Sequence, residues 1–157
     1  MKNEINEINP LNCDREALGM KGDLNKAPIC GVVATAILAD KPYAEVRDFF
    51  RKQKVASGIK PNIRKGLTNI EIEKALDHFG VQRFPKKSYF NKGLSFFHWH
   101  QYYPEMDVTY LIQITGHILI YRNGYVMDQW TNEPRKLINC KSRNCLMVFA
   151  TQIKKGE

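Results

Sequence analysis

The sequence predicts an α+β fold, in which helices from the first part of the chain pack on an antiparallel sheet formed by the C-terminal part. Two observations indicate this order. Apolar residues recur at helical spacing between residues 29 and 103, and from residue 109 onward they alternate or are β-branched, as in strands. A chain of 157 residues has the size of one domain. We therefore treat residues 1–157 as a single domain with an irregular arm at 1–24.

The first predicted helix covers residues 29–39 and is expected to be the central one. Pro28 suits its first turn, where a missing backbone N–H costs nothing. Cys30 therefore opens this helix, and the Val, Ala and Ile residues that follow make nearly every side apolar, which is typical of a buried helix. A second helix is predicted over residues 42–54, where four residues form one apolar stripe: Tyr43, Val46, Phe49 and Phe50.

A third helix has clear signals at both ends. Thr68 and Glu71 form a capping box at its start, and Gly80 is a C-terminal stop. We expect a short strand directly after it, at residues 81–84. The inward face of this helix should carry Ile72, Ala75, Leu76 and Phe79.

An aromatic segment at residues 94–103 is compatible with a strand or a helix. We favour a helix that ends before Pro104, because four of its residues share one helical face. These residues are Phe96, Phe97, His100 and Tyr103. The aromatic side chains here are expected to serve packing.

The strands of the sheet follow this segment. Residues 109–115 and 117–130 are β-branched or alternate, and the second run is interrupted by Asn123-Gly124, the strongest short signal for a hairpin. A final strand is predicted at residues 145–153. All of these strands lie in the C-terminal part of the chain, so the sheet is expected to be antiparallel.

The predicted hairpin brings a histidine and a carboxylate together. A two-residue turn pairs Arg122 with Tyr125, which sets Leu119 opposite Asp128 and His117 opposite Trp130. Residues that are opposite each other, or two apart on one strand, share a face of the sheet. His117 and Asp128 are therefore diagonal neighbours on one face, unless a one-residue bulge in the turn exchanges the faces. A carboxylate beside an imidazole orients a catalytic base and stabilises its protonated form.

Cys30 is the candidate nucleophile. A thiol in the first turn of a helix lies at the positive end of the helix dipole, which lowers its pKa. A histidine within hydrogen-bonding reach would complete an activated nucleophile, and His117 with Asp128 supplies that histidine. Taken singly, Cys30 is more often an inert thiol that fills space in the core, and His117 a satisfied core residue. The joint placement of Cys30, His117 and Asp128 favours the active site.

The chain resembles the papain-like cysteine peptidases in the residues that carry this site. The matching stretches are ICGVVATAIL, with Cys30 at the start of the helix, and TGHILIYRNGYVMDQW, with His117, Asp128 and a tryptophan two residues later. The bacteriocin-processing C39-like branch and small bacteriophage proteins are most similar. The resemblance implies a papain-like fold and a Cys30–His117–Asp128 triad that cleaves a peptide bond or a side-chain amide. A phage-encoded factor that acts on a host protein in the host cytoplasm would fit the same pattern.

The chain departs from the family at the position that stabilises the oxyanion. The family usually has a glutamine a few residues before the cysteine, whereas here Leu24 is six residues before Cys30 and Asn25 is five before it. Asn25 has an amide donor of the right chemistry on a shorter arm, so we assign it as the oxyanion donor together with the backbone N–H of Cys30. The resemblance leaves peptidase and deamidase both open.

The net charge of +8 supports a different class of function. The charge is densest in a basic segment, expected to be an exposed loop, that starts at Arg51 and runs past Lys65. A catalytically weak or inactive papain-fold protein could use this segment (residues 51–65) to bind nucleic acid or an acidic protein. No recognition motif for nucleic acid accompanies the charge.

No cofactor or metal is predicted. Cys140 and Cys145 lack a second pair of ligands, and we interpret them as structural thiols at a strand edge. His98 and His100 point apart on a helix, and no third ligand is near them in sequence. The N-terminus has no apolar signal segment, and no apolar run reaches the length of a membrane span, so we expect a cytoplasmic protein without membrane contact.

Overall fold

The computed structural model describes residues 30–56, 69–89, 93–129 and 134–154, and the predicted arm at 1–24 lies outside them. Within these ranges the fold is α+β, with four α-helices and a six-stranded sheet. The α-helices are α1 (Cys30–Ala39), α2 (Tyr43–Ala56), α3 (Asn69–His78) and α4 (Phe96–Tyr102). The strands are β1 (Arg83–Tyr89), β2 (Thr109–Ile114), β3 (His117–Arg122), β4 (Tyr125–Met127), β5 (Arg135–Lys136) and β6 (Met147–Ile153). Two 3₁₀ helices, η5 (Leu137–Asn139) and η6 (Lys141–Asn144), connect β5 to β6.

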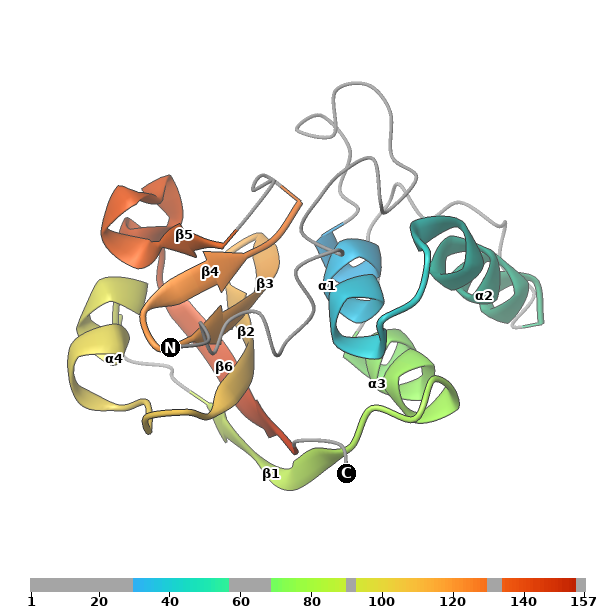
Figure 1. The fold of residues 1–157 in the computed structure, drawn as a ribbon, viewed down its shortest axis with the longest axis horizontal. Coiled ribbons are helices and arrows are strands. Elements are labelled where there is room, and N and C mark those ends of the chain that lie inside the picture. Colours follow the sequence, from blue (N-terminus) through green and yellow to red (C-terminus); the bar gives the residue numbers. More distant parts are fainter. Residues whose placement is uncertain (1–29, 57–68, 90–92, 130–133, 155–157) are drawn as a thin grey trace, which may run out of the picture.

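The sheet is antiparallel throughout, in the order β1-β6-β2-β3-β4-β5. Helices α1, α2 and α3 lie together on one side of it, while α4 and the 3₁₀ helices lie on the other (Figure 1). β1 is longer than the strand predicted at 81–84, because its backbone pairs with β6 at the edge of the sheet. That partner lies far away in the sequence, so no local pattern could set the length of β1.

The hairpin between β3 and β4 has the predicted register. Arg122 pairs with Tyr125, and the ladder ends at the pair formed by Ile120 and Met127. Asn123 and Gly124 in the turn both have positive φ, 50° and 87°, as a two-residue turn of this type requires. No bulge intervenes, so the predicted faces hold.

The alternation of side chains along the sheet divides the core into two clusters. Ile118 and Ile120 face α1, α2 and α3, whereas Leu119 and Tyr121 face α4 and the 3₁₀ helices. In α1, the residues from Gly31 to Ile37 are all buried, which confirms that this helix is central. The predicted stripes of α2 and α3 also point inward, with Val46, Phe50, Ala75 and Leu76 completely buried.

Helix α4 forms as predicted but packs through a different face. Ser95 caps it by accepting a hydrogen bond from the backbone N–H of His98, at 3.1 Å. The buried residues are Phe96 and Trp99, while Tyr103 is 54% exposed. The predicted face was therefore wrong at Tyr103, since Trp99 instead packs against two tyrosines of the sheet.

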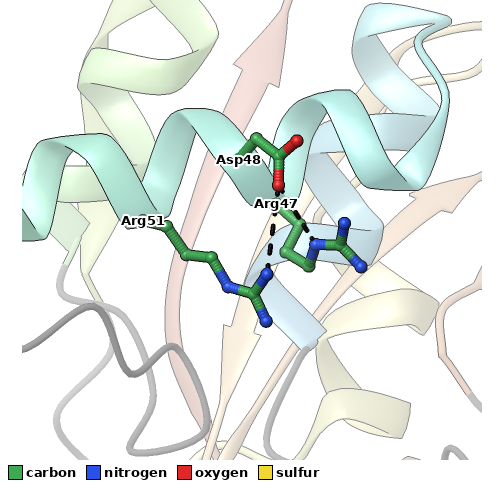
Figure 2. Close-up of polar contacts among 3 residues, drawn as sticks. All are labelled: Arg47, Asp48 and Arg51. Carbon is green, nitrogen blue, oxygen red and sulfur yellow. Dashed lines mark hydrogen bonds and ion pairs between the residues drawn. The ribbon is translucent and has the colours of Figure 1, made fainter.

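The start of the basic segment is helical rather than an exposed loop. Arg51 belongs to α2, and its guanidinium lies 4.0 Å from Asp48, which also contacts Arg47 at 3.3 Å (Figure 2). Lys54 is buried, with its ammonium 3.1 Å from the carboxylate of Glu71 on α3. Lys54 therefore joins two helices and is not available to a partner, which corrects the expectation of a wholly exposed segment. Residues 57–65 of that segment lie outside the described ranges.

Candidate active site

Cys30 is the first residue of α1, and its half-buried sulfur lies beside the first residues of β3. The thiol is hydrogen-bonded to the ring of His117, and the backbone N–H groups of Ile118 and Gly31 donate to the sulfur. Burial acts to raise the pKa of Cys30, but these donors and the positive charge of His117 outweigh it, and the pKa is lowered from its ordinary value of 9.0. The thiolate of Cys30 therefore forms at a lower pH than that of an ordinary cysteine.

His117 is the first residue of β3, and its side chain is buried, with 4% exposed. Its Nε2 lies 2.8 Å from Oδ2 of Asp128, the residue directly after β4. Because Asp128 occupies Nε2, the remaining ring nitrogen, Nδ1, is the one that faces Cys30. The carboxylate thus fixes the orientation of the ring, as the hairpin register predicted.

Burial of His117 acts to lower its pKa, since the charged ring loses its contact with water. The hydrogen bonds and charges of Asp128 and Cys30 outweigh this effect and raise the pKa of His117 to about 9. The raised pKa of the imidazole and the lowered pKa of the thiol have the same consequence. Both shifts favour a thiolate beside an imidazolium over the neutral pair.

Cys30 and His117 reach each other around the end of a strand. By alternation His117 belongs to the face that carries Leu119, whereas α1 packs on the opposite face. The β3–β4 ladder ends at Ile120, so the first residues of β3 pair with β2 but not with β4. Helix α1 begins beside this stretch, where the N–H of Ile118 donates to the Cys30 sulfur. No pattern in the sequence indicates this donor, since any residue except proline supplies a backbone N–H.

Two of the residues singled out from the sequence are outside the described ranges. Asn25, predicted to stabilise the oxyanion, and Trp130, predicted to lie opposite His117, are both in such segments. Asn25 therefore stays a prediction.

The other cysteines do not share the features of Cys30. Cys140 is buried, donates to the carbonyl oxygen of Lys136 at 3.4 Å, and has a pKa raised by burial and by the charge of Asp128. Both Cys140 and Cys145 are free thiols beside the 3₁₀ helix η6. These contacts fit the structural role assigned to them.

The HxH pair on α4 is not arranged around a common point. Nδ1 of His100 lies 2.6 Å from the hydroxyl of Tyr121, whereas His98 packs its ring against Tyr102. Over the described residues, no group of three or more His, Cys, Asp or Glu side chains is positioned to hold a metal ion. No helix in these ranges has the length and apolar character needed to cross a membrane.

Comparison of the chain with protein-family models, with curated proteins and with solved structures found no match. The assignment of a function therefore depends on the chemistry of Cys30, His117 and Asp128.

Proposed function

We propose that this protein is a papain-like thiol hydrolase that cleaves an amide bond through Cys30, His117 and Asp128. The observation that carries the proposal is the hydrogen-bonded chain from Cys30 to His117 to Asp128, with 2.8 Å between the last two. Such a chain supplies a nucleophile, a base that takes and returns its proton, and a group that orients the base.

The proposed reaction has two steps. The thiolate of Cys30 attacks the carbonyl carbon, and the C–N bond breaks as His117 gives its proton to the departing amine. A water molecule then gives a proton to His117 and attacks the thioester carbonyl carbon. The C–S bond breaks, which releases the acid and restores the thiolate of Cys30 beside the protonated His117. Asp128 keeps Nδ1 of His117 directed at the sulfur in both steps.

The oxyanion of each step requires donors near Cys30. We assign this role to the side-chain amide of Asn25 and to the backbone N–H of Cys30. Removal of one oxyanion donor costs about 100-fold or more in rate in related chemistry, so Asn25→Ala should slow turnover without changing the reactivity of the thiol.

Three features support the papain-like fold. The nucleophile opens the central buried helix, the base opens a neighbouring strand of an antiparallel sheet, and the carboxylate follows the next strand. A peptidase and a deamidase would use the same arrangement, because they differ in which amide enters the site.

A mixture of synthetic peptides that contain internal glutamine tests the function. Mass spectrometry separates shortened products, expected of a peptidase, from intact peptides with the small mass gain of amide-to-acid conversion, expected of a deamidase. Cys30→Ala should abolish either product, and Cys140→Ala is the matched control that should keep it. Products that persist in Cys30→Ala would contradict the proposal.

The second candidate is a papain-fold binding protein without turnover. Asn25 in place of the family's glutamine favours it, and so does the net charge of +8. A reactive Cys30 that turns over no peptide, together with tight binding of an acidic partner, is the result expected of this alternative.

A further inference from the structure

The candidate site is bordered on one side by a surface of positive charge that the sequence analysis did not single out. Residues 134–144 contain four basic residues and no acidic residue. They form β5, η5 and η6, which cover the end of the sheet next to β4. In Figure 1, these elements lie at the edge of the sheet where the strand β5 is labelled.

Arg135 lies on the same face of the sheet as His117 and Asp128. It pairs with Val126, and residues that are opposite each other in an antiparallel pair share a face. Val126 and Asp128 are two residues apart, so Arg135 is a diagonal neighbour of Asp128. Lys136, the next residue, pairs with Tyr125 and belongs to the opposite face.

The 3₁₀ helix η6 adds two further cations to this border. Lys141 is exposed, and Arg143 donates to the carbonyl oxygen of Cys140 at 2.9 Å. Cys140 is close enough to Asp128 for the two charges to interact, and Arg135 and Arg143 act on the same thiol. Arg135 and Arg143 therefore lie towards the Asp128 end of the site, and Lys141 lies between Cys140 and Arg143 in the sequence. We call Arg135, Lys141 and Arg143 the basic rim.

The basic rim also carries apolar surface. Ile138, between Arg135 and Lys141 in the sequence, is 61% exposed. A surface that combines cations with an exposed aliphatic side chain suits a peptide that alternates carboxylates with apolar groups better than it suits a bare phosphate backbone.

We propose that the basic rim binds acidic residues of a polypeptide whose chain then reaches Cys30. That this polypeptide is a substrate rests on the proposed thiol-hydrolase function. Its binding to the basic rim can be measured without any turnover.

The test is protection of Cys30 from iodoacetamide, a neutral reagent, with the modified cysteine identified by peptide mapping. The probe is a short peptide of glutamate, leucine and glycine, and its control replaces each glutamate by serine. At low ionic strength the acidic peptide should slow the alkylation of Cys30 about threefold or more, since the cations of the rim then act on its carboxylates with little screening. The serine peptide should not protect, and added salt should remove the protection.

The variant Arg135→Gln/Lys141→Gln should lose the protection. Both side chains are exposed and Arg143 is retained because it supports the backbone at Cys140. A matched control should keep the protection: Arg51→Gln/Lys52→Gln removes the same charge from α2. Circular dichroism and the melting temperature verify that each variant is folded.

Three results would overturn the inference. These are protection that survives in Arg135→Gln/Lys141→Gln, protection that falls equally in Arg51→Gln/Lys52→Gln, and equal protection by oligothymidylate, which would indicate nucleic acid. The alkylation rate without peptide reports separately on the reactivity of Cys30. An ordinary thiol that is nevertheless protected through Arg135 and Lys141 would refute the hydrolase and retain the acidic polypeptide as the ligand.

Discussion

Cys30 and His117 have pKa values shifted in opposite directions, and these two shifts affect how the stability of the folded state depends on pH. His117 has its pKa raised to about 9, so its contribution to stability is complete below its ordinary value of 6.5 and is lost as the pH rises through about 9. Cys30 has its pKa lowered, so its contribution is present above 9.0 and is lost as the pH falls through the lowered value. Where the thiolate–imidazolium pair exists between pH 6.5 and pH 9.0, the folded and unfolded chains bind equal numbers of protons at these two residues.

Removal of the thiol should therefore change the pH dependence of stability. In Cys30→Ala, His117 still gains its proton from the contact with Asp128, but no thiol releases one. The free energy of unfolding should then fall as the pH rises above 6.5, by up to about 1.4 kcal/mol per pH unit more steeply than in the wild type. Urea titrations at several pH values measure the two slopes. Equal slopes in the wild type and Cys30→Ala would contradict the paired titration, and Cys140→Ala should follow the wild type.

At the scale of elements, the β3–β4 hairpin is the part of the site that the sequence predicted best. Its turn residues fix its register locally, and the register fixes the contact between His117 and Asp128. The approach of Cys30 could only be proposed by resemblance, because it depends on how α1 packs against the sheet. The burial of Lys54 was missed for the same reason, since its partner Glu71 lies on another helix.

Gly124 is the residue on which the turn depends. Its φ of 87° lies in the left-handed region, and a Cβ at this position would lie 3.4 Å from Cε1 of His100. Gly124→Ala should lower the free energy of unfolding by about 1–2 kcal/mol. Gly80 has a φ of 77°, and nothing lies within 4 Å of a Cβ built there. Gly80→Ala therefore measures the cost of the backbone conformation without the crowding by a neighbouring side chain. Urea denaturation measures both, and a Gly124→Ala protein as stable as the wild type would show that the turn is not constrained in this way.

At the scale of the whole molecule, the sheet is shared by two core clusters that face opposite ways. The order of helices and strands and the central position of α1 were predicted from apolar periodicity. The pairing of β1 with β6 and the packing of Trp99 were not, because each is decided by contacts between distant parts of the chain. The sequence did not predict the basic rim, because the position of its cations relative to Asp128 depends on how the chain folds.

The two clusters should unfold together. Leu119 and Ile120 are adjacent, completely buried, and belong to opposite clusters. Leu119→Ala and Ile120→Ala should each lower the free energy of unfolding by about 3 kcal/mol, in a single transition seen equally by fluorescence and circular dichroism. Ile138→Ala, at a residue that is 61% exposed, should change it by less than about 0.5 kcal/mol. Transitions that separate in one variant would mean that the clusters are independent.

The central claim is that His117 activates Cys30, and the pH dependence of Cys30 alkylation tests it most directly. Iodoacetamide rates at Cys30, resolved by peptide mapping, should reach half of their maximum below pH 9.0 in the wild type. In His117→Ala the midpoint should move above that of the wild type, because burial then acts on the thiol without its partner. A midpoint at the ordinary value of a free thiol in both proteins would contradict the claim.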